Sequence, residues 1–181
     1  GCDKPDLRNP LVLHNIKDIV KDVEFKVFAD YVTKKDSRIV ALKIPNGCDL
    51  SRKDIDTYTE LVKRFGAKGL AYIKCENISN IEDGVTSPIK KYLTNDVLQS
   101  IIDKVDAHDN DLIFFSADNN KIVNDSMSVL IKEIAVNLGL LQGEWSLLWV
   151  TDYPLFELDT KTKKITSIHH PFTSPKNPGD L

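Results

Sequence analysis

Residues 51–75 read SRKDIDTYTELVKRFGAKGLAYIKC and carry the clearest local signals for the fold. Ser51 followed by Asp54 resembles a capping box, with Asp in place of the usual Glu, and predicts that a helix begins there. Apolar residues then recur at spacings of three and four, as on one face of a helix: Ile55, Tyr58, Leu61, Val62 and Phe65. Gly66 predicts the end of this helix, and residues 69–75 (GLAYIKC) predict a buried strand.

Similar patterns predict further helices and strands on both sides of this stretch. The alternation of residues 23–31 predicts a strand, and a polar turn at 33–37 leads into a second strand at 38–44. The other expected strands are 111–116, 147–150, 155–158 and 165–168. The other expected helices are 87–93 after the Ser87–Pro88 start, 94–105 capped by Thr94, and one from Asp118 or Asn119 to near Gly139. This order has no strict βαβ alternation and predicts an α+β fold.

Composition bounds the class of protein. The chain has 181 residues, of which 41% are hydrophobic and 28% charged, and this balance excludes a disordered or low-complexity chain. Its length suits one domain, or one domain with part of another. The 24 basic and 27 acidic residues give a net charge of −3, which argues against a polycation but leaves room for a local basic face.

Cysteine usage and the termini indicate the compartment. The 3 cysteines are far apart and outside any CxxC pattern, so we expect neither a disulfide framework nor a cysteine zinc site. No apolar run approaches the roughly 18 residues of a membrane span, and the start GCDKPDLRNP has no apolar signal core. We therefore expect a cytoplasmic protein. The missing initiator Met suggests a piece cut from a longer chain.

Two pairs of residues invite a catalytic or binding interpretation. No Walker loop, GxGxxG, GxSxG or HExxH motif occurs. Adjacent side chains on a strand point to opposite faces, so His169 and His170 do not suit one metal ion. They are either one packed ring and one solvated ring, or they include an imidazole that reaches an anionic ligand. Asp3 and Asp6 are either catalytic carboxylates or caps of the loop at Pro5.

Several segments, in collinear order, resemble the bacterial-type aspartyl-tRNA synthetases of class II. Residues 148–156 (LWVTDYPLF) and 169–176 (HHPFTSPK) are similar to the C-terminal part of that family. Residues 1–8 (GCDKPDLR) are similar to the segment after its motif 2, although the family usually has Ser at the position of Cys2. The family also has an inserted domain, the GAD domain, which amidotransferase subunits share. Three segments here resemble it: GAKGLAYIK at 66–74, Ser87–Pro88 and FFSAD at 114–118.

This resemblance implies a domain organisation. Residues 1–22 and 141–181 would belong to the antiparallel class II catalytic domain, and residues 23–140 would form the inserted α+β domain. The HHPFTSPK loop would lie at the amino-acid site, with His169 against the bound L-aspartate and His170 as its neighbour. A protonated imidazole suits a carboxylate ligand. The resemblance assigns no catalytic residue and no metal ligand within this chain.

The resemblance also implies an activity for the full-length enzyme. It would join aspartate to ATP in the presence of Mg²⁺ and transfer the aspartyl group to tRNA-Asp, or to both tRNA-Asp and tRNA-Asn. It would be a homodimer that does not enter membranes. The family's motifs 1, 2 and 3, which supply most ATP and Mg²⁺ contacts, have no counterpart here. We therefore expect this fragment alone to be inactive and to bind no cofactor.

Basic residues are candidates for tRNA contact. The resemblance places the insert near the acceptor stem, where phosphates would meet lysine and arginine without reading the sequence. The candidates are Lys63, Arg64, Lys68, Lys90 and Lys91. The alternative is ordinary solvated surface. No interleaved run of aromatic and basic residues predicts single-strand stacking.

Two other functions are alternatives to a ligase fragment. One is a non-catalytic tRNA-binding module, as in an amidotransferase subunit, and the other is a stand-alone interaction domain with no RNA role. LWVTDYP and HHPFTSPK argue against the first because they resemble the synthetase body outside the insert. The truncated-looking ends argue against the second.

Overall fold

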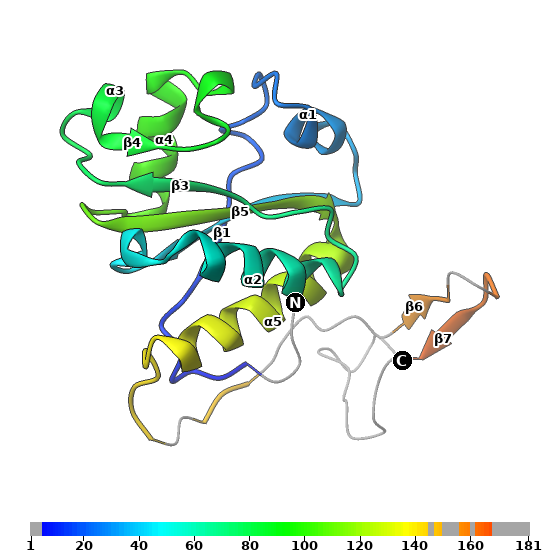
Figure 1. The fold of residues 1–181 in the computed structure, drawn as a ribbon. Coiled ribbons are helices and arrows are strands. Elements are labelled where there is room, and N and C mark those ends of the chain that lie inside the picture. Colours follow the sequence, from blue (N-terminus) through cyan, green and yellow to red (C-terminus); the bar gives the residue numbers. More distant parts are fainter. Residues whose placement is uncertain (1–4, 145–146, 150–155, 160–161, 168–181) are drawn as a thin grey trace. The chain divides into compact units, whose positions relative to one another are not determined.

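The computed structural model describes residues 5–144, 147–149, 156–159 and 162–167, and the chain divides into two compact units, Gly1–Glu144 and Trp145–Leu181. The first unit contains an α+β domain with a five-stranded sheet (Figure 1). Its strands are β1 (Leu13–Asn15), β2 (Ser37–Ile44), β3 (Ala71–Cys75), β4 (Val85–Thr86) and β5 (Asp111–Asn119). Its helices are α1 (Lys26–Val32), α2 (Arg52–Lys63), α3 (Ile81–Gly84), α4 (Asn95–Val105) and α5 (Asn120–Asn137), with 3-10 turns η1 (Gly47–Asp49) and η2 (Lys90–Tyr92).

The sheet of this unit is antiparallel, with strand order β1-β2-β5-β3-β4. Strand β5 lies at the centre and pairs with the full length of β2, from Ser37 opposite Asn119 to Ile44 opposite Leu112. Strand β3 runs along its other edge, with Ala71 opposite Phe115. Because helices cover both faces of the sheet, β5 has buried side chains on both of its faces, including Phe114 and Phe115.

Two hydrophobic cores lie on opposite faces of the sheet. One contains Phe28 of α1 and Leu98, Ile101 and Ile102 of α4 packed with Phe115. The other contains residues of α2 and α5 packed around Phe114. The result is a three-layer arrangement, with α1 and α4 on one side and α2 and α5 on the other (Figure 1).

Capping explains where several predicted helices begin. Ser51 and Asp54 form the expected reciprocal capping box, because the Ser51 Oγ accepts from the Asp54 N–H at 3.2 Å and Asp54 accepts from the Ser51 N–H at 2.9 Å. Thr94 caps α4, and Asn119 caps α5 by accepting from the Ile122 N–H at 2.9 Å. These helix starts and the strand at 111–116 are confirmed, although β5 continues to Asn119.

The strand predicted over residues 23–31 is wrong. Phe28 and Tyr31, three positions apart, are the residues that α1 buries, whereas Val27 and Ala29 are exposed. Their spacing matches one face of a helix, and packing of Phe28 on Phe115 with ring centroids 6.0 Å apart decides between the two patterns. The predicted strand at 38–44 is confirmed as β2.

Other differences concern short elements. The helix predicted over 87–93 is only the turn η2 (Lys90–Tyr92). Just before it, the Ser87 hydroxyl accepts from the Ile89 N–H at 3.0 Å. Strands β1 and β4 and helix α3 were not predicted, since segments of two to four residues carry little periodicity. Residues 147–149 are not in a strand, and residue 150 of that predicted strand lies outside the described residues.

The second unit contains a hairpin. Strands β6 (Phe156–Leu158) and β7 (Ile165–Ser167) pair antiparallel, with Phe156 opposite Ser167. They confirm the described part of the strands predicted at 155–158 and 165–168. The predicted domain boundaries at 22/23 and 140/141 stay a prediction. Within the first unit, Ile16 and Val20 pack in the same core as α1 and α4.

Candidate nucleic-acid interface

The end of α2 carries two of the five predicted tRNA contacts. Lys63 lies in the last helical turn, and its Nζ forms an ion pair of 2.7 Å with Glu60 Oε1. Arg64 is the C-cap residue of the same helix, and both basic side chains are exposed. Cations at a helix C-terminus interact favourably with the helix dipole, so a structural role accounts for their position as well as a phosphate contact would.

Lys68 follows in the loop before β3 and lies against Tyr31 of α1. Its Nζ donates a hydrogen bond of 2.9 Å to the Tyr31 hydroxyl and is 5.2 Å from the centroid of the ring. This hydrogen bond is the largest cause of a raised Lys68 pKa, so the side chain is an ammonium at neutral pH. Lys34 Nζ lies 4.3 Å from the same ring centroid. The Tyr31 ring is therefore in contact with two lysines, only one of which was predicted as a site residue.

Lys90 and Lys91 are neighbours in η2 but differ in their contacts. The Nζ of Lys90 donates to the main-chain carbonyls of Glu82 and Val85, the latter at 2.8 Å, and therefore holds the α3–β4 segment. Lys91 is exposed, and its Nζ lies 5.0 Å from the centroid of the Tyr92 ring. The Lys91 ammonium is thus available to a ligand, whereas the Lys90 ammonium already donates to two main-chain carbonyls of the domain.

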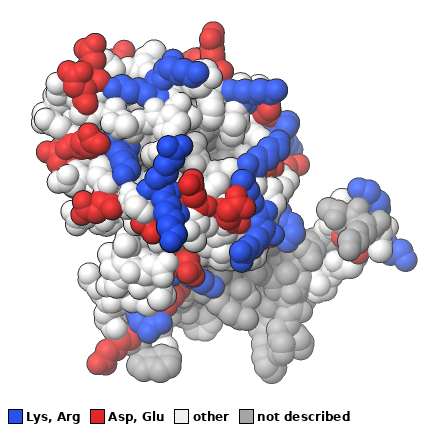
Figure 2. Space-filling view, in the orientation of Figure 1, with Lys and Arg blue, Asp and Glu red and all other residues white. Residues whose placement is uncertain are grey.

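Basic side chains are unevenly distributed on the face of the molecule that Figure 2 shows. Lysine and arginine gather along the edge where α1 and the turn before β3 lie, with acidic side chains among them (Figure 2). The mixture agrees with the small net charge of −3. Contacts with an anionic partner would be local rather than spread over a large basic face.

The predicted aspartate-site residues, His169 and His170, lie outside the described residues. Asp3 also lies outside them, whereas Asp6 is described. The Asp6 carboxylate accepts from Arg8 Nε at 2.9 Å and from Arg8 Nη2 at 2.7 Å, and this pairing lowers the pKa of Asp6 to about 2. A carboxylate held this way stays ionised and is a poor proton donor, which favours the structural interpretation of Asp6.

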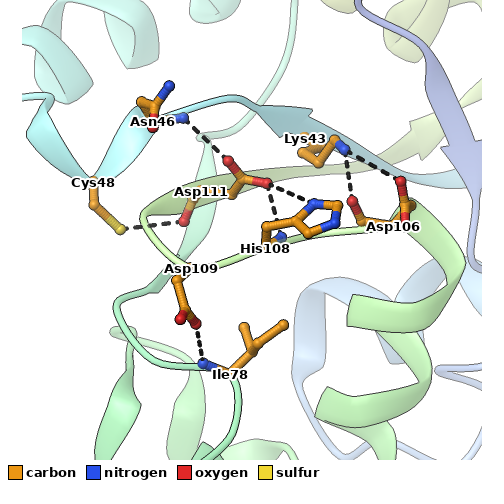
Figure 3. A network of polar contacts seen from close by, with 8 residues as sticks. All are labelled: Lys43, Asn46, Cys48, Ile78, Asp106, His108, Asp109 and Asp111. Atoms are coloured by element: carbon orange, nitrogen blue, oxygen red, sulfur yellow. Dashed lines mark hydrogen bonds and ion pairs between the residues drawn. The ribbon is translucent and has the colours of Figure 1, made fainter.

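One polar cluster combines a cysteine, a histidine and carboxylates, as some catalytic sites do (Figure 3). The Cys48 thiol donates to the Asp111 main-chain carbonyl at 3.2 Å, and burial is the largest cause of its raised pKa. Its sulfur is therefore a thiol and a weak nucleophile. The Asp111 carboxylate accepts main-chain N–H groups from Asn46 and His108, at 3.1 and 2.9 Å. These contacts join the turn that leaves β2 to the turn that enters β5 and do not form a nucleophile–base pair.

The described residues offer neither a metal site nor a membrane span. They hold no group of three or more histidine, cysteine, aspartate or glutamate side chains placed to bind a metal ion. No helix among them is both long and apolar enough to cross a membrane. We assign no described residue to Mg²⁺ or ATP.

The structure also brings together residues that the sequence analysis did not single out. Phe25, the N-cap residue of α1, packs on Tyr92 with ring centroids 5.3 Å apart and an interplanar angle of 33°. Tyr92 is 41% exposed. Lys91 lies over the Tyr92 ring, and Phe25 lines the same cavity as Lys68, which lies over the Tyr31 ring. These contacts join three separate segments, so no local motif could have revealed them.

Comparison with known families defines the class of this fold. The family model for the GAD domain matches residues 28–127, from α1 into the middle of α5. The chain therefore belongs to the GAD domain family.

Three curated relatives extend the match to almost the whole chain. They are aspartate–tRNA(Asp/Asn) ligases of Legionella pneumophila strains Corby, Paris and Philadelphia 1, each 51% identical over 176 residues. The match covers 97% of this chain but only 30% of each relative, so the chain spans under a third of their length. The resemblance to aspartyl-tRNA synthetases noted in the sequence is thereby confirmed.

Proposed function

We propose that this chain is part of an aspartate–tRNA ligase, in which it supplies the inserted GAD domain and flanking catalytic-domain segments. The observation that carries the proposal is the extent of the match. Similarity to the ligases covers 97% of the chain, whereas the GAD domain alone accounts for residues 28–127. An amidotransferase subunit would share the domain but not both flanks, so this extent favours the ligase over the non-catalytic module.

The whole enzyme, in this proposal, joins aspartate to ATP as aspartyl-adenylate, releases pyrophosphate, and transfers the aspartyl group to tRNA with release of AMP. ATP and Mg²⁺ bind the full-length enzyme mainly through motifs that have no counterpart in this chain, and we expect this fragment to bind neither by itself. His169 contacts the substrate carboxylate and His170 supports it. We place the homodimeric enzyme in the cytoplasm, a location that suits the free thiols of Cys48 and Cys75.

The GAD domain, in the same proposal, contributes weak phosphate contacts to tRNA. Of the five candidates, Lys68 and Lys91 are supported best, because each is exposed and lies over an aromatic ring without an ion pair to a carboxylate of the described residues. Lys63 would have to exchange its Glu60 partner, and Lys90 would have to release two carbonyls. Arg64 lies next to Lys63 and would act with it.

A chimaera tests the ligase assignment. Replacing the matched segment of a Legionella pneumophila ligase by these 181 residues should retain aspartate-dependent pyrophosphate exchange and aspartylation of tRNA. A matched chimaera that exchanges only residues 28–127 controls for the insert alone. If the short exchange is active and the long one is folded but inactive, the flanks are not ligase segments. The isolated chain should show only background exchange, because it lacks the donors that stabilise the reacting phosphate.

Salt titration tests the phosphate contacts. Binding of labelled tRNA to the isolated chain should be weak and should fall with salt, with a log–log slope of about −2 for about three contacts. Binding that does not respond to salt would assign these lysines to ordinary solvated surface.

A further inference from the structure

Three segments that are far apart in the sequence form one aromatic–lysine surface, which we define as Phe25, Tyr31, Lys34, Lys68, Lys91 and Tyr92. Helix α1 lies over the end of the sheet where β3 begins, and this position brings the segments together (Figure 1). Phe25 packs on Phe28 at 5.1 Å in an edge-to-face arrangement and on Tyr92 at 5.3 Å. The surface therefore rests on rings that the core holds in place.

Two residues of this surface, Phe25 and Lys68, also line a cavity of about 210 Å³. Its walls are mostly apolar and include Phe25, Phe28 and Phe115, and two exposed residues, Val27 and Lys68, mark its mouth. Gly69 also lines it, and a Cβ at Gly69 would meet no atom within 4 Å. The cavity is smaller than the roughly 300–1,000 Å³ of typical small-molecule sites, so it suits one flat ring rather than a whole nucleotide.

Charge around the cavity favours an anionic partner. The ammonium groups of Lys34, Lys68 and Lys91 lie over tyrosine rings, and none of the three forms an ion pair with a carboxylate among the described residues. Asp30 and Asp118 are the carboxylates whose charge acts on Lys68 from further away. An unpaired stretch of RNA matches this combination, since it offers exposed bases for aromatic contact and a phosphate on each side.

We propose that the aromatic–lysine surface binds an unpaired RNA nucleotide, with its base ring against Phe25 at the cavity mouth and the adjoining phosphates near Lys34, Lys68 and Lys91. This inference rests on the proposed role in tRNA charging and deepens it. Duplex RNA keeps its bases stacked and can engage only the lysines. Single-stranded RNA therefore binds more tightly than duplex RNA of the same length, with little preference for sequence.

The test compares binding of fluorescently labelled single-stranded RNA and duplex RNA to the 181-residue chain at low salt. Gly69→Leu adds a side chain at the cavity wall, at a position where a Cβ meets no atom within 4 Å. It should weaken single-strand binding about tenfold, the effect of losing one stacked base, and leave duplex binding unchanged. Lys68→Gln should reduce the salt slope for single strands by about 0.7. Lys53→Gln, an exposed lysine at the start of α2, is the matched control and should change neither.

Several outcomes would overturn the inference. Equal affinity for single-stranded and duplex RNA would show that binding depends on the lysine charges alone and involves no base contact. Polyglutamate that binds as tightly as single-stranded RNA would show the same. A Gly69→Leu chain with unaltered circular dichroism and unaltered RNA affinity would exclude the cavity. If Gly69→Leu fails to fold, an unchanged salt slope for Lys68→Gln excludes the site by itself. Pyrophosphate exchange by the chimaera needs no RNA, so a loss of exchange would count against the ligase assignment and not against this surface.

Discussion

Asp111, at the start of β5, accepts a hydrogen bond of 3.1 Å from the main-chain N–H of Asn46, which lies 65 positions earlier in the chain. The other carboxylate oxygen accepts from the His108 N–H at 2.9 Å, and the residue is only 6% exposed (Figure 3). One side chain thus holds the turn that leaves β2 and the turn that enters β5. These two strands form the longest ladder of the sheet.

We expect Asp111→Ala to lower the free energy of unfolding by about 2–3 kcal/mol, because two main-chain donors lose a charged acceptor. Asp111→Asn should cost less, since its amide oxygen can still accept from one of them. Urea unfolding measures both, and Asp56→Ala on the exposed side of α2 serves as the control. A chain with Asp111→Ala that is as stable as this control would show that solvent satisfies both donors.

Lys90 and Lys91 offer a pair of variants with opposite expected effects. Lys90→Met removes the donor to the carbonyls of Glu82 and Val85, so the free energy of unfolding should fall by about 1 kcal/mol while RNA affinity stays the same. Lys91→Met should leave stability within about 0.5 kcal/mol but weaken RNA binding. Urea unfolding and RNA titration of both variants check the prediction. The reverse pattern would mean that Lys90 is the phosphate contact.

His14 on β1 should make stability depend on pH. Burial, followed by the charges of Lys104 and Lys43, lowers the His14 pKa below its ordinary value of 6.5. The unfolded chain therefore takes up a proton first as the pH falls below about 6.5, and the folded state loses stability down to its own lower pKa. Urea unfolding between about pH 8 and pH 5 should show a shallower decline for His14→Gln than for the original chain. If the free energy of unfolding falls equally steeply with pH in both chains, His14 is not the cause of the pH dependence.

His169 should affect aspartate binding in a ligase that contains this segment. Its position matches the first histidine of the family's HHPFTSP loop, and an imidazolium stabilises a carboxylate ligand. His169→Ala should raise the KM for aspartate roughly ten- to a hundred-fold, as expected for loss of about 1.5–3 kcal/mol, and should change the KM for ATP less.

His170→Ala is the matched control for that experiment and should have the smaller effect. Pyrophosphate exchange with aspartate and ATP varied separately measures both variants. An effect of His170→Ala alone would mean that the other imidazole contacts the substrate, and no effect of either would make the pair structural.

Local sequence was sufficient to predict a helix or strand wherever one segment contains both the signal for its start and a clear apolar periodicity. Ser51 with Asp54, Thr94 and Asn119 each satisfy a main-chain N–H within three positions, so the starts of α2, α4 and α5 could be predicted to within a residue. The long apolar run of β5 was equally clear. The motifs of the GAD domain and its flanks also sufficed to indicate the family, which the comparisons confirm.

Tertiary packing decided what local patterns left open. Residues 23–31 fit a strand as well as a helix, and burial of Phe28 and Tyr31 in the core around Phe115 favours the helix α1. The roles of the lysines were equally hidden, because a lysine has the same charge whether it holds carbonyls, as Lys90 does, or lies over a ring, as Lys91 does. The aromatic–lysine surface arises from contacts between segments tens of residues apart. Local periodicity indicates which side of one helix or strand is apolar. Contacts between distant segments depend on which of these elements the folded chain places next to one another.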